Sequence, residues 1–408
     1  MPLLRSINFL HGIKLSSMGL ILAFASQVNA NVEFEASGKA TAELRLFPES
    51  PQFSHQYQNA NVSLAIEPDL FWQWNDGLDS LSFKSFLRLD QHDDERTHAD
   101  IRELIWIHQG DDWELRSGIG KVFWGVTEFQ HLVDVINQSD SIEDIDGEDK
   151  LGQPMINLSL VKDWGIVDLY ILPGFREQTF PGKKGRLRSG LVVDTDQAQY
   201  EATNDERHTD LAVRWSHSIG DFDIGTHWFR GTNRDPILQA GLKGSETVLI
   251  PYYEQMNQFG LDLQATIDSW LWKAETIWRN TDSSTYWAAQ AGFEYTFYGI
   301  QESNTDLGVL LEYGWDQRGK KATAVFQNDI SIGARLALND TASTEMLAGI
   351  IYDLDYESTS FQVEFSRRLG DKWKISLDGR FFSPENDDKL LSSFDKDNHI
   401  QIGVERYF

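Results

Sequence analysis

Segments in which apolar and polar residues alternate with a period of two run along most of this chain. In residues 259–267, Phe, Leu, Leu, Ala and Ile share one face of an extended strand, whereas Gly, Asp, Gln and Thr share the other. Similar divisions occur in 307–313, 330–336 and 373–378. Such alternation is typical of a strand with one apolar and one polar face. It predicts an all-β protein, either a soluble sandwich or a barrel.

The connections between these segments alternate in length. Short turns are expected at 75–77, 110–112, 163–165, 220–221, 268–269, 301–305, 339–343 and 370–372. Longer loops are expected at 48–60, 91–99, 126–153, 176–209, 231–256, 281–285, 318–327, 357–359 and 383–398. Outer-membrane barrels have short periplasmic turns, long extracellular loops and an even number of strands. The pattern predicts a transmembrane antiparallel up-and-down β-barrel of about 18 strands, or about 16 if a weak pair within 345–369 is merged.

Tryptophans fall near both ends of the expected strands. Those beside short turns are Trp74, Trp113, Trp164, Trp270 and Trp373. Those near the opposite ends are Trp124, Trp228, Trp278, Trp287 and Trp315. Because tryptophan collects at both membrane–water interfaces, two belts of this kind favour a membrane barrel over a soluble sandwich.

The first 30 residues have the layout of a secretory signal peptide. Arg5 and Lys14 precede the apolar run 18–25, and small residues follow at 28–30. The run is too short for a membrane helix, which needs about 20 apolar residues. We expect Sec-dependent export, cleavage after residue 30 and a single barrel domain made by residues 31–408.

The last residue, Phe408, ends a strand whose apolar face also carries Ile400, Ile402 and Val404, although Arg406 interrupts that face. A final strand ending in an aromatic residue is how outer-membrane barrels close. Phe408 is therefore interpreted as the signal read by the barrel-assembly machinery. This places the protein in the outer membrane of a Gram-negative bacterium, in contact with outer-membrane lipid and lipopolysaccharide.

Composition excludes several kinds of site. The chain has no cysteine, which rules out disulfide scaffolds, thiolate metal sites and cysteine nucleophiles. Its formal net charge of −27 disfavours nucleic acid as a partner, because phosphate binding requires clustered Lys and Arg.

Histidines near serine and aspartate raise the possibility of a hydrolase. The residues concerned are His208, His217, His227, Asp210, Asp223, Ser216 and Ser218. On a strand, however, His217 points to the face opposite its serine neighbours, and the chain has no Gly-x-Ser-x-Gly elbow. We expect no catalytic residue, no cofactor and no enzymatic activity.

Charged residues on the inferred inner faces are the candidates for function, because about 16 to 18 strands enclose an aqueous channel. One group of pore-lining candidates is a basic ladder of Lys84, Arg88, Arg102 and Arg116. The other is an acidic wall of Asp262, Glu275, Glu294 and Glu312. Opposed walls would create a transverse field that orients charged solutes, whereas mixed, hydrated charge pairs are the ordinary alternative. The sequence predicts a porin or diffusion channel for small polar or charged solutes, with a structural or surface-interaction barrel with a plugged lumen as the alternative.

The segment 120–140 is too apolar for a freely solvated loop. It contains Trp124-Gly125 and, further on, Val135-Ile136-Asn137-Gln138-Ser139-Asp140. This resembles the Trp-Gly and Val-Ile-Asn-x-x-Asp pattern of a family of porin-like outer-membrane barrels, some linked to passage of hydrophobic or polysaccharide compounds. The resemblance therefore adds a barrel that facilitates passage of such compounds as a further alternative function. One departure is Gln138, where a proline is expected.

The resemblance implies a loop that folds inward and constricts the pore. The residues it assigns to this constriction loop are Trp124, Phe129, Asp134, Asn137 and Asp140. The resemblance of the whole chain to general porins of this size also implies a homotrimer.

An acidic run continues the loop to residue 149. Asp144, Asp146 and Asp149 are weak calcium candidates, since carboxylate oxygens suit Ca²⁺. The spacing does not match the twelve-residue calcium loop, and a solvated loop or a lipopolysaccharide contact through divalent ions is the alternative. A basic counterpart lies in 176–188, which could bind anions or pair with the acidic run.

Overall fold

A computed structural model describes residues 32–324 and 327–408; the expected signal peptide lies outside these ranges. Eighteen strands form one antiparallel sheet that closes on itself. They are β1 (Glu33–Leu46), β2 (Ala60–Trp74), β3 (Asp79–Asp90), β4 (His98–Gln109), β5 (Trp113–Gly120), β6 (Gln153–Lys162), β7 (Gly165–Pro173), β9 (Thr209–Ile219), β10 (Phe222–Thr232), β13 (Gln255–Ile267), β14 (Trp270–Thr281), β15 (Thr285–Phe297), β16 (Asp306–Asp316), β17 (Asn328–Ala337), β18 (Glu345–Asp353), β19 (Thr359–Leu369), β20 (Trp373–Ser383) and β21 (His399–Tyr407). The prediction of an antiparallel barrel of about 18 strands is confirmed, and the weak pair forms β18 and β19 as separate strands.

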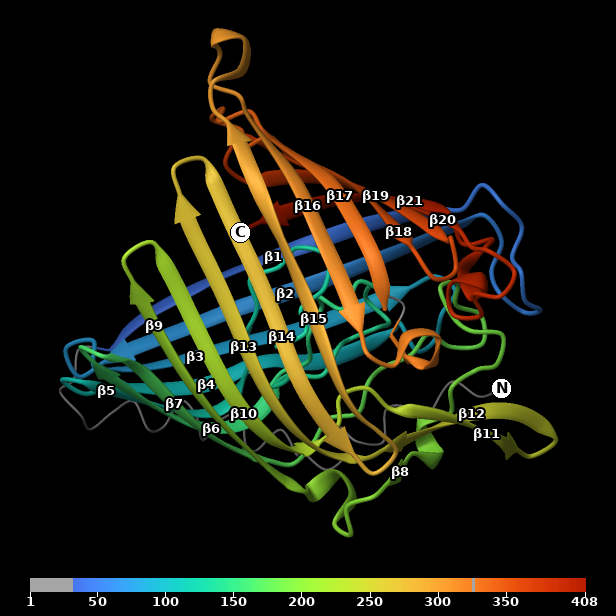
Figure 1. Cartoon of the computed structure of the whole chain (residues 1–408), viewed down its shortest axis with the longest axis horizontal. Helices are drawn as coiled ribbons and strands as arrows, with labels where there is room; N and C mark the ends of the chain where they lie inside the picture. Colours follow the sequence, from blue (N-terminus) through green and yellow to red (C-terminus); the bar gives the residue numbers. More distant parts are fainter. Residues whose placement is uncertain (1–31, 325–326) are drawn as a thin grey trace.

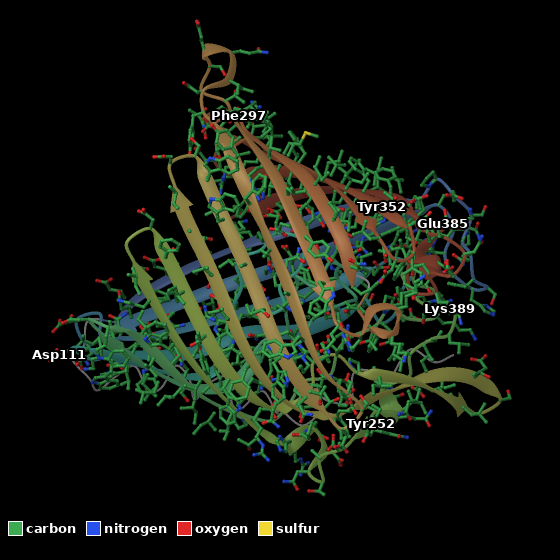
Figure 2. The ribbon with its side chains drawn as sticks, viewed as in Figure 1. Asp111, Tyr252, Phe297, Tyr352, Glu385 and Lys389 are labelled. Carbon is green, nitrogen blue, oxygen red and sulfur yellow. The ribbon has the colours of Figure 1, made fainter. Side chains whose placement is uncertain are left out.

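The barrel has a turn end, where the short connections lie, and a loop end, where the long ones lie (Figure 1). Figure 2 labels Asp111 and Phe297 at the turn end and Tyr252, Glu385 and Lys389 at the loop end. Within the described ranges, no helix is long and apolar enough to cross a membrane. The short 3₁₀ helices are η2 (Thr195–Gln197), η3 (Asp205–Arg207), η4 (Ile300–Glu302), η5 (Gly319–Lys321) and η6 (Leu391–Phe394).

A second, small sheet forms where the sequence suggested only loops. β11 (Ile237–Lys243) and β12 (Glu246–Tyr253) make an antiparallel hairpin, and β8 (Gln199–Tyr200) pairs with β12 in parallel. Figure 1 shows this hairpin extending from the loop end. The residues around the tip of this hairpin, 243–247, are polar or glycine. The alternation of apolar and polar residues therefore did not distinguish the hairpin from a loop.

The barrel is apolar outside, whereas its inner face carries many charged residues beside a smaller apolar cluster. Phe259, Trp287, Ile332 and Tyr352 lie on the outer face and are 40 to 52% exposed. The alternate residues of the same strands face inward and include many buried charged groups. An outward apolar band with a polar interior is the arrangement of barrels embedded in lipid.

The tryptophans divide as expected with one exception. At the turn end, Trp164 and Trp373 are exposed, and Trp270 stacks on Trp272 with ring centroids 5.3 Å apart. At the loop end, Trp287 is exposed. Trp124 does not belong to the second belt, because it is only 4% exposed and packs inside the barrel. It lies in the loop after β5, where the alternation of a strand does not apply.

The ends of the described chain meet at the seam between β1 and β21. The backbone N–H of Gly38 donates to the carbonyl of Phe408, and the N–H of Phe408 donates back to Gly38, both at 3.1 Å. A Cβ on Gly38 would lie 2.8 Å from the Phe408 ring. The absence of a side chain at Gly38 therefore lets the last residue lie flat on the first strand.

Candidate functional site

The strand register places all eight pore-lining candidates on the inner face. Asp262 lies opposite Glu275, which lies opposite Gln290, so one row of inward residues crosses β13 to β15. Glu294 and Glu312 occupy β15 and β16. The basic candidates come from β3, β4 and β5, on a separate arc of the barrel.

The long loop between β5 and β6, residues 121–152, lies within the ring of strands (Figure 1). Its side chains Trp124, Val133, Val135 and Ile136 are at most 4% exposed. They form one apolar cluster with inward residues of the wall, including Phe229, Met256, Ile277 and Ala288. Burying these side chains removes apolar surface from water, which favours an inward position of the loop.

Two members of the acidic wall bind the backbone of this loop. Glu275 accepts hydrogen bonds from the backbone N–H groups of Val126 at 2.7 Å, Thr127 at 3.1 Å and Val133 at 3.2 Å. It also accepts the Thr127 hydroxyl at 2.7 Å. Irregular backbone inside a protein needs partners for its N–H groups, and an ionised carboxylate is a pure acceptor. Glu275 thus satisfies donors that have no strand partner.

Glu312 has the same role for the two loop residues that follow Thr127. It accepts the N–H groups of Glu128 at 2.8 Å and Phe129 at 3.2 Å, and the side-chain amide of Gln290 at 2.9 Å. The remaining acidic candidates pair with side chains instead: Asp262 binds Arg214 through both oxygens.

The tip of the loop reaches across to β17 and β18. The Glu128 carboxylate lies 3.3 Å from Lys273 and 2.6 Å from Arg335. The Phe129 ring occupies space over Gly349, where a Cβ would come within 2.7 Å of it. Arg335 also lies 3.7 Å from Glu294, which connects the last acidic candidate to the same group of charges.

Two members of the basic ladder bind the acidic part of the loop. Arg88 lies 2.6 Å from Glu143 and 3.1 Å from Glu43. Arg102 lies 2.5 Å from Asp140. Both arginines are less than 10% exposed. The neighbouring carboxylates, rather than water, therefore balance their charges.

The other two basic candidates differ in having solvated side chains. Lys84, whose side chain is 46% exposed, lies 3.7 Å from Asp69 and 3.8 Å from Glu103. Arg116, whose side chain is 42% exposed, pairs with Glu114 at 2.5 Å. The four residues of the expected ladder therefore differ on the same inner face. Arg88 and Arg102 are buried against the loop, whereas Lys84 and Arg116 are solvated.

The remaining constriction-loop candidates shape the loop itself. Asn137 accepts the N–H of Val122 at 2.8 Å and donates to the carbonyls of Gly120 and Leu151, which ties together the two ends of the loop. Asp134 lies 3.2 Å from Lys150, and burial raises the pKa of the Asp134 carboxyl despite that lysine.

Gln138, which replaces the proline expected from the resemblance, uses its side-chain amide. Its Nε2 donates to the backbone carbonyl of Arg234 at 3.0 Å. Arg234 in turn donates to the carbonyl of Ile136 at 2.9 Å and pairs with Asp210 at 2.8 Å. Arg234 carried no sequence signal, because its main partner in the loop is a backbone carbonyl.

Two of the three calcium candidates face a guanidinium. Asp144 and Asp146 lie 3.5 and 2.8 Å from Arg380 of β20. Burial and the neighbouring Asp144 raise the pKa of Asp146 to about 7, although Arg380 lowers it. Burial and then Glu143 raise the pKa of Asp149 to about 6. The raised pKa values reflect burial first, and then the crowding of carboxylates in this part of the loop.

Among the hydrogen bonds of the described ranges, no serine considered for hydrolysis binds a histidine, and Ser218 donates to Asp223 instead. His208 binds Asp210 at 2.8 Å, and His227 contacts Gln258 at 3.1 Å and packs on Trp124. His217 lies opposite Ile224 on the outer face.

A cavity of about 530 Å³ adjoins the loop. It is lined by loop residues such as Glu128 and Leu132 and by Arg279, Tyr286 and Arg318 of the wall and the loop end. The Arg318 guanidinium lies 3.7 Å from the centroid of the Tyr286 ring, while Arg279 pairs with Asp235 at 2.5 Å.

Known proteins resemble this chain in fold rather than in sequence. No protein-family model and no curated protein matches it. A BenF-like porin from Pseudomonas fluorescens Pf-5 superimposes with a TM-score of 0.53 at 9% identity, over 93% of this chain and 98% of that one. A mutant of the Rh. blastica porin gives a TM-score of 0.44 at 10% identity, over 92% and 100% of the two chains. OmpT, an outer membrane protein of Vibrio cholerae, gives 0.44 at 11% identity, over 92% and 98%. The match to the BenF-like porin shows that this chain has the closed barrel fold of an outer-membrane porin.

Proposed function

We propose that the protein is an outer-membrane diffusion channel for small polar or charged solutes, with loop 121–152 as its constriction. The observation that carries this proposal is the solvation of inward-facing charges. The side chains of Lys84, Arg116 and Arg335 are 46, 42 and 39% exposed although all three face the lumen. Charged groups of this kind require water, because transfer to a dry interior is costly. A water-filled lumen is therefore expected beside the loop.

The constriction is supported by the way the loop is held. Its backbone binds Glu275 and Glu312 on one wall, and its acidic part binds Arg88 and Arg102 on another. A loop fixed on two sides narrows the lumen by a constant amount, as a size filter requires. The solvated groups that remain carry both signs of charge, which suits polar, charged and zwitterionic solutes.

Single-channel recording in planar bilayers tests the proposal. The folded protein should give stable conductance steps, and liposome swelling should show faster entry of small sugars, amino acids or dicarboxylates than of large ones. Folded protein that gives no steps would refute the channel.

A plugged structural barrel is the second candidate, and the reach of the loop favours it. The loop contacts inward residues of β3, β4, β14, β16, β17 and β20. In that case, the same recordings would show no conductance, while the loop end would bind its partners normally.

Export and assembly belong to the same proposal. We expect the mature chain to begin at residue 31, which the mass of the protein purified from outer membranes would test. A homotrimer in contact with lipopolysaccharide is expected from the resemblance to general porins, and cross-linking in native membranes would test it.

A further inference from the structure

Three potential metal ligands from two elements meet beside the barrel wall. His98 is the first residue of β4, whereas Asp140 and Glu143 belong to loop 121–152. His98 Nε2 lies 3.9 Å from Asp140 Oδ2 and 3.7 Å from Glu143 Oε1. All three atoms lie within 4.8 Å of one another. The side chains of Asp140 and Glu143 are 0 and 6% exposed.

The histidine is oriented as a ligand. Its Nδ1 lies 3.1 Å from the backbone carbonyl of Arg96. A carbonyl only accepts, so this contact places the proton of a neutral imidazole on Nδ1 and the lone pair on Nε2. A second hydrogen bond of this kind typically fixes metal-binding histidines. The Nε2 lone pair then points toward two carboxylates.

Neither His98 Nε2 nor Glu143 Oε1 has a hydrogen-bond partner among the residues that the structure describes. A buried carboxylate oxygen without a partner is costly, and a lone pair facing it adds repulsion. The unpartnered oxygen of Glu143 and the nitrogen of His98 thus mark a place for a positive charge.

The carboxylates are held from behind. Arg88 binds Glu143 Oε2 at 2.6 Å, and Thr179 donates to Asp140 Oδ1 at 2.6 Å. Arg102 lies 2.5 Å from Asp140 Oδ2, the same oxygen that faces His98. These contacts fix both carboxylates before any ligand binds, as outer partners do in metal sites. The positive charges of Arg88 and Arg102 are in turn balanced by Glu43 and Asp100.

The distances from His98 Nε2 to the two carboxylate oxygens fit a bound metal ion better than a protonated histidine that donates to them. An imidazolium bonded to both carboxylates would bring each N···O distance to about 2.7–3.2 Å, and the observed separations are longer. A tetrahedral zinc ion lies about 2.0–2.2 Å from nitrogen and oxygen ligands, which places those ligands about 3.4 Å apart. Small inward movements of the three side chains would reach that geometry.

We propose that His98, Asp140 and Glu143 bind one divalent transition-metal ion of the zinc type, which fastens loop 121–152 to the start of β4. An imidazole with two carboxylates suits zinc and similar ions, whereas calcium and magnesium prefer oxygen ligands alone. Three protein ligands leave a fourth position for water. The site differs from the calcium candidates Asp144, Asp146 and Asp149, and it does not depend on whether the barrel conducts.

Metal binding to the folded full-length protein in detergent tests the proposal. After EDTA treatment and dialysis, calorimetry with zinc and elemental analysis should give one zinc per chain. His98→Gln should weaken zinc binding by at least about 10-fold, on the scale seen for disturbed metal sites. His131→Gln is the matched control, because His131 lies in the same loop, 3.9 Å from Glu148, but outside the three-ligand group. It should bind zinc as the unaltered protein does.

Equal zinc binding by His98→Gln, or equal loss in His131→Gln, would overturn the proposal. Cobalt gives a measurement that needs no variant: four-coordinate Co²⁺ should produce strong visible absorption in the unaltered protein, which zinc abolishes and calcium does not. Absence of that absorption at saturating cobalt, or its loss on adding an equal concentration of calcium, would also overturn it. The shift in electrophoretic mobility on boiling verifies that each variant is a folded barrel.

Discussion

Glu275 shows how much of the interior depends on one ionised side chain. Its two oxygens accept three backbone N–H groups and one hydroxyl from a loop more than a hundred residues away in sequence. Hydrogen bonds to a charged acceptor are stronger than those between neutral groups. The loop position is therefore sensitive to the charge at this single residue.

Glu275→Gln should loosen the loop while keeping the side-chain shape. The amide loses the charge and presents N–H donors to backbone N–H groups, so we expect a loss of about 1–3 kcal/mol in unfolding free energy. We also expect noisier single-channel currents. Glu294→Gln is the control, because Glu294 lies 3.7 Å from Arg335 and serves no loop N–H among the hydrogen bonds of the described ranges. Equal effects of the two substitutions would contradict the anchoring role of Glu275.

Asp93 makes the loop end sensitive to pH. Its carboxylate accepts the N–H of Gly182 at 3.0 Å and that of Glu95 at 3.2 Å, joining two loops. Burial raises the pKa of Asp93 to about 6, although these hydrogen bonds lower it. Because the pKa is higher in the folded than in the unfolded chain, Asp93 disfavours the folded state above about pH 6, and this cost disappears as the pH falls toward 4.

Asp93→Asn should remove this dependence, since the amide keeps an acceptor oxygen but no charge. Relative to the unaltered protein, it should be stabilised at pH 8 by up to about 3 kcal/mol and nearly unchanged at pH 4. Denaturant unfolding at the two pH values measures the difference. A constant difference between the proteins at both pH values would count against the raised pKa.

At the scale of elements, the sequence predicted the strands better than the contacts of the loop. Alternation in segments such as 259–267 identified the inner face, and therefore Glu275 and Glu312. The apolar side chains of the loop predicted that it would not be solvated. The partners were not predictable, because backbone N–H groups at Val126 or Glu128 have no residue-specific signature. Trp124 was misplaced for a related reason: a loop lacks the period that assigns a face.

Shortening the loop should change both conductance and selectivity. Replacing residues 126–134 by three glycines removes the backbone partners of Glu275 and Glu312 and frees two carboxylates in the lumen. We expect a several-fold larger conductance and a shift toward cations, because bare carboxylates attract them. Replacing the β11–β12 hairpin by a short turn is the control and should leave the conductance within the lumen unchanged. An unaltered conductance after loop shortening would exclude residues 126–134 as the constriction.

For the whole molecule, closure of the barrel leaves none of its 18 described strands with a free edge. The seam is formed by β1 and β21, with Lys39 opposite Tyr407 and Leu46 opposite Ile400. The sequence placed Phe408 at the end of an apolar strand face, and its backbone pairs with Gly38 at this seam. Nothing in the sequence indicated Gly38, because the need for a glycine there arises only when β1 and β21 meet.

Gly38→Val should impair closure. Its Cβ would lie 2.7 Å from the Glu67 carbonyl and 2.8 Å from the Phe408 ring, so either the seam or the terminal residue must shift. We expect several-fold less folded protein in the outer membrane and unfolding at lower temperature in the electrophoretic assay. Ala40→Val adds side-chain volume on the same strand and face and should behave normally. Equal yields of the two variants would show that the Phe408 contact does not limit closure.

The loop that crosses the interior also has a mechanical consequence. A wide ring of strands resists stretching, because its hydrogen bonds are continuous, but it flattens easily into an ellipse. Loop 121–152 joins β3 and β4 on one side to β14, β16 and β17 on another. We therefore expect the loop to keep the cross-section from flattening when the lateral pressure in the surrounding lipid changes.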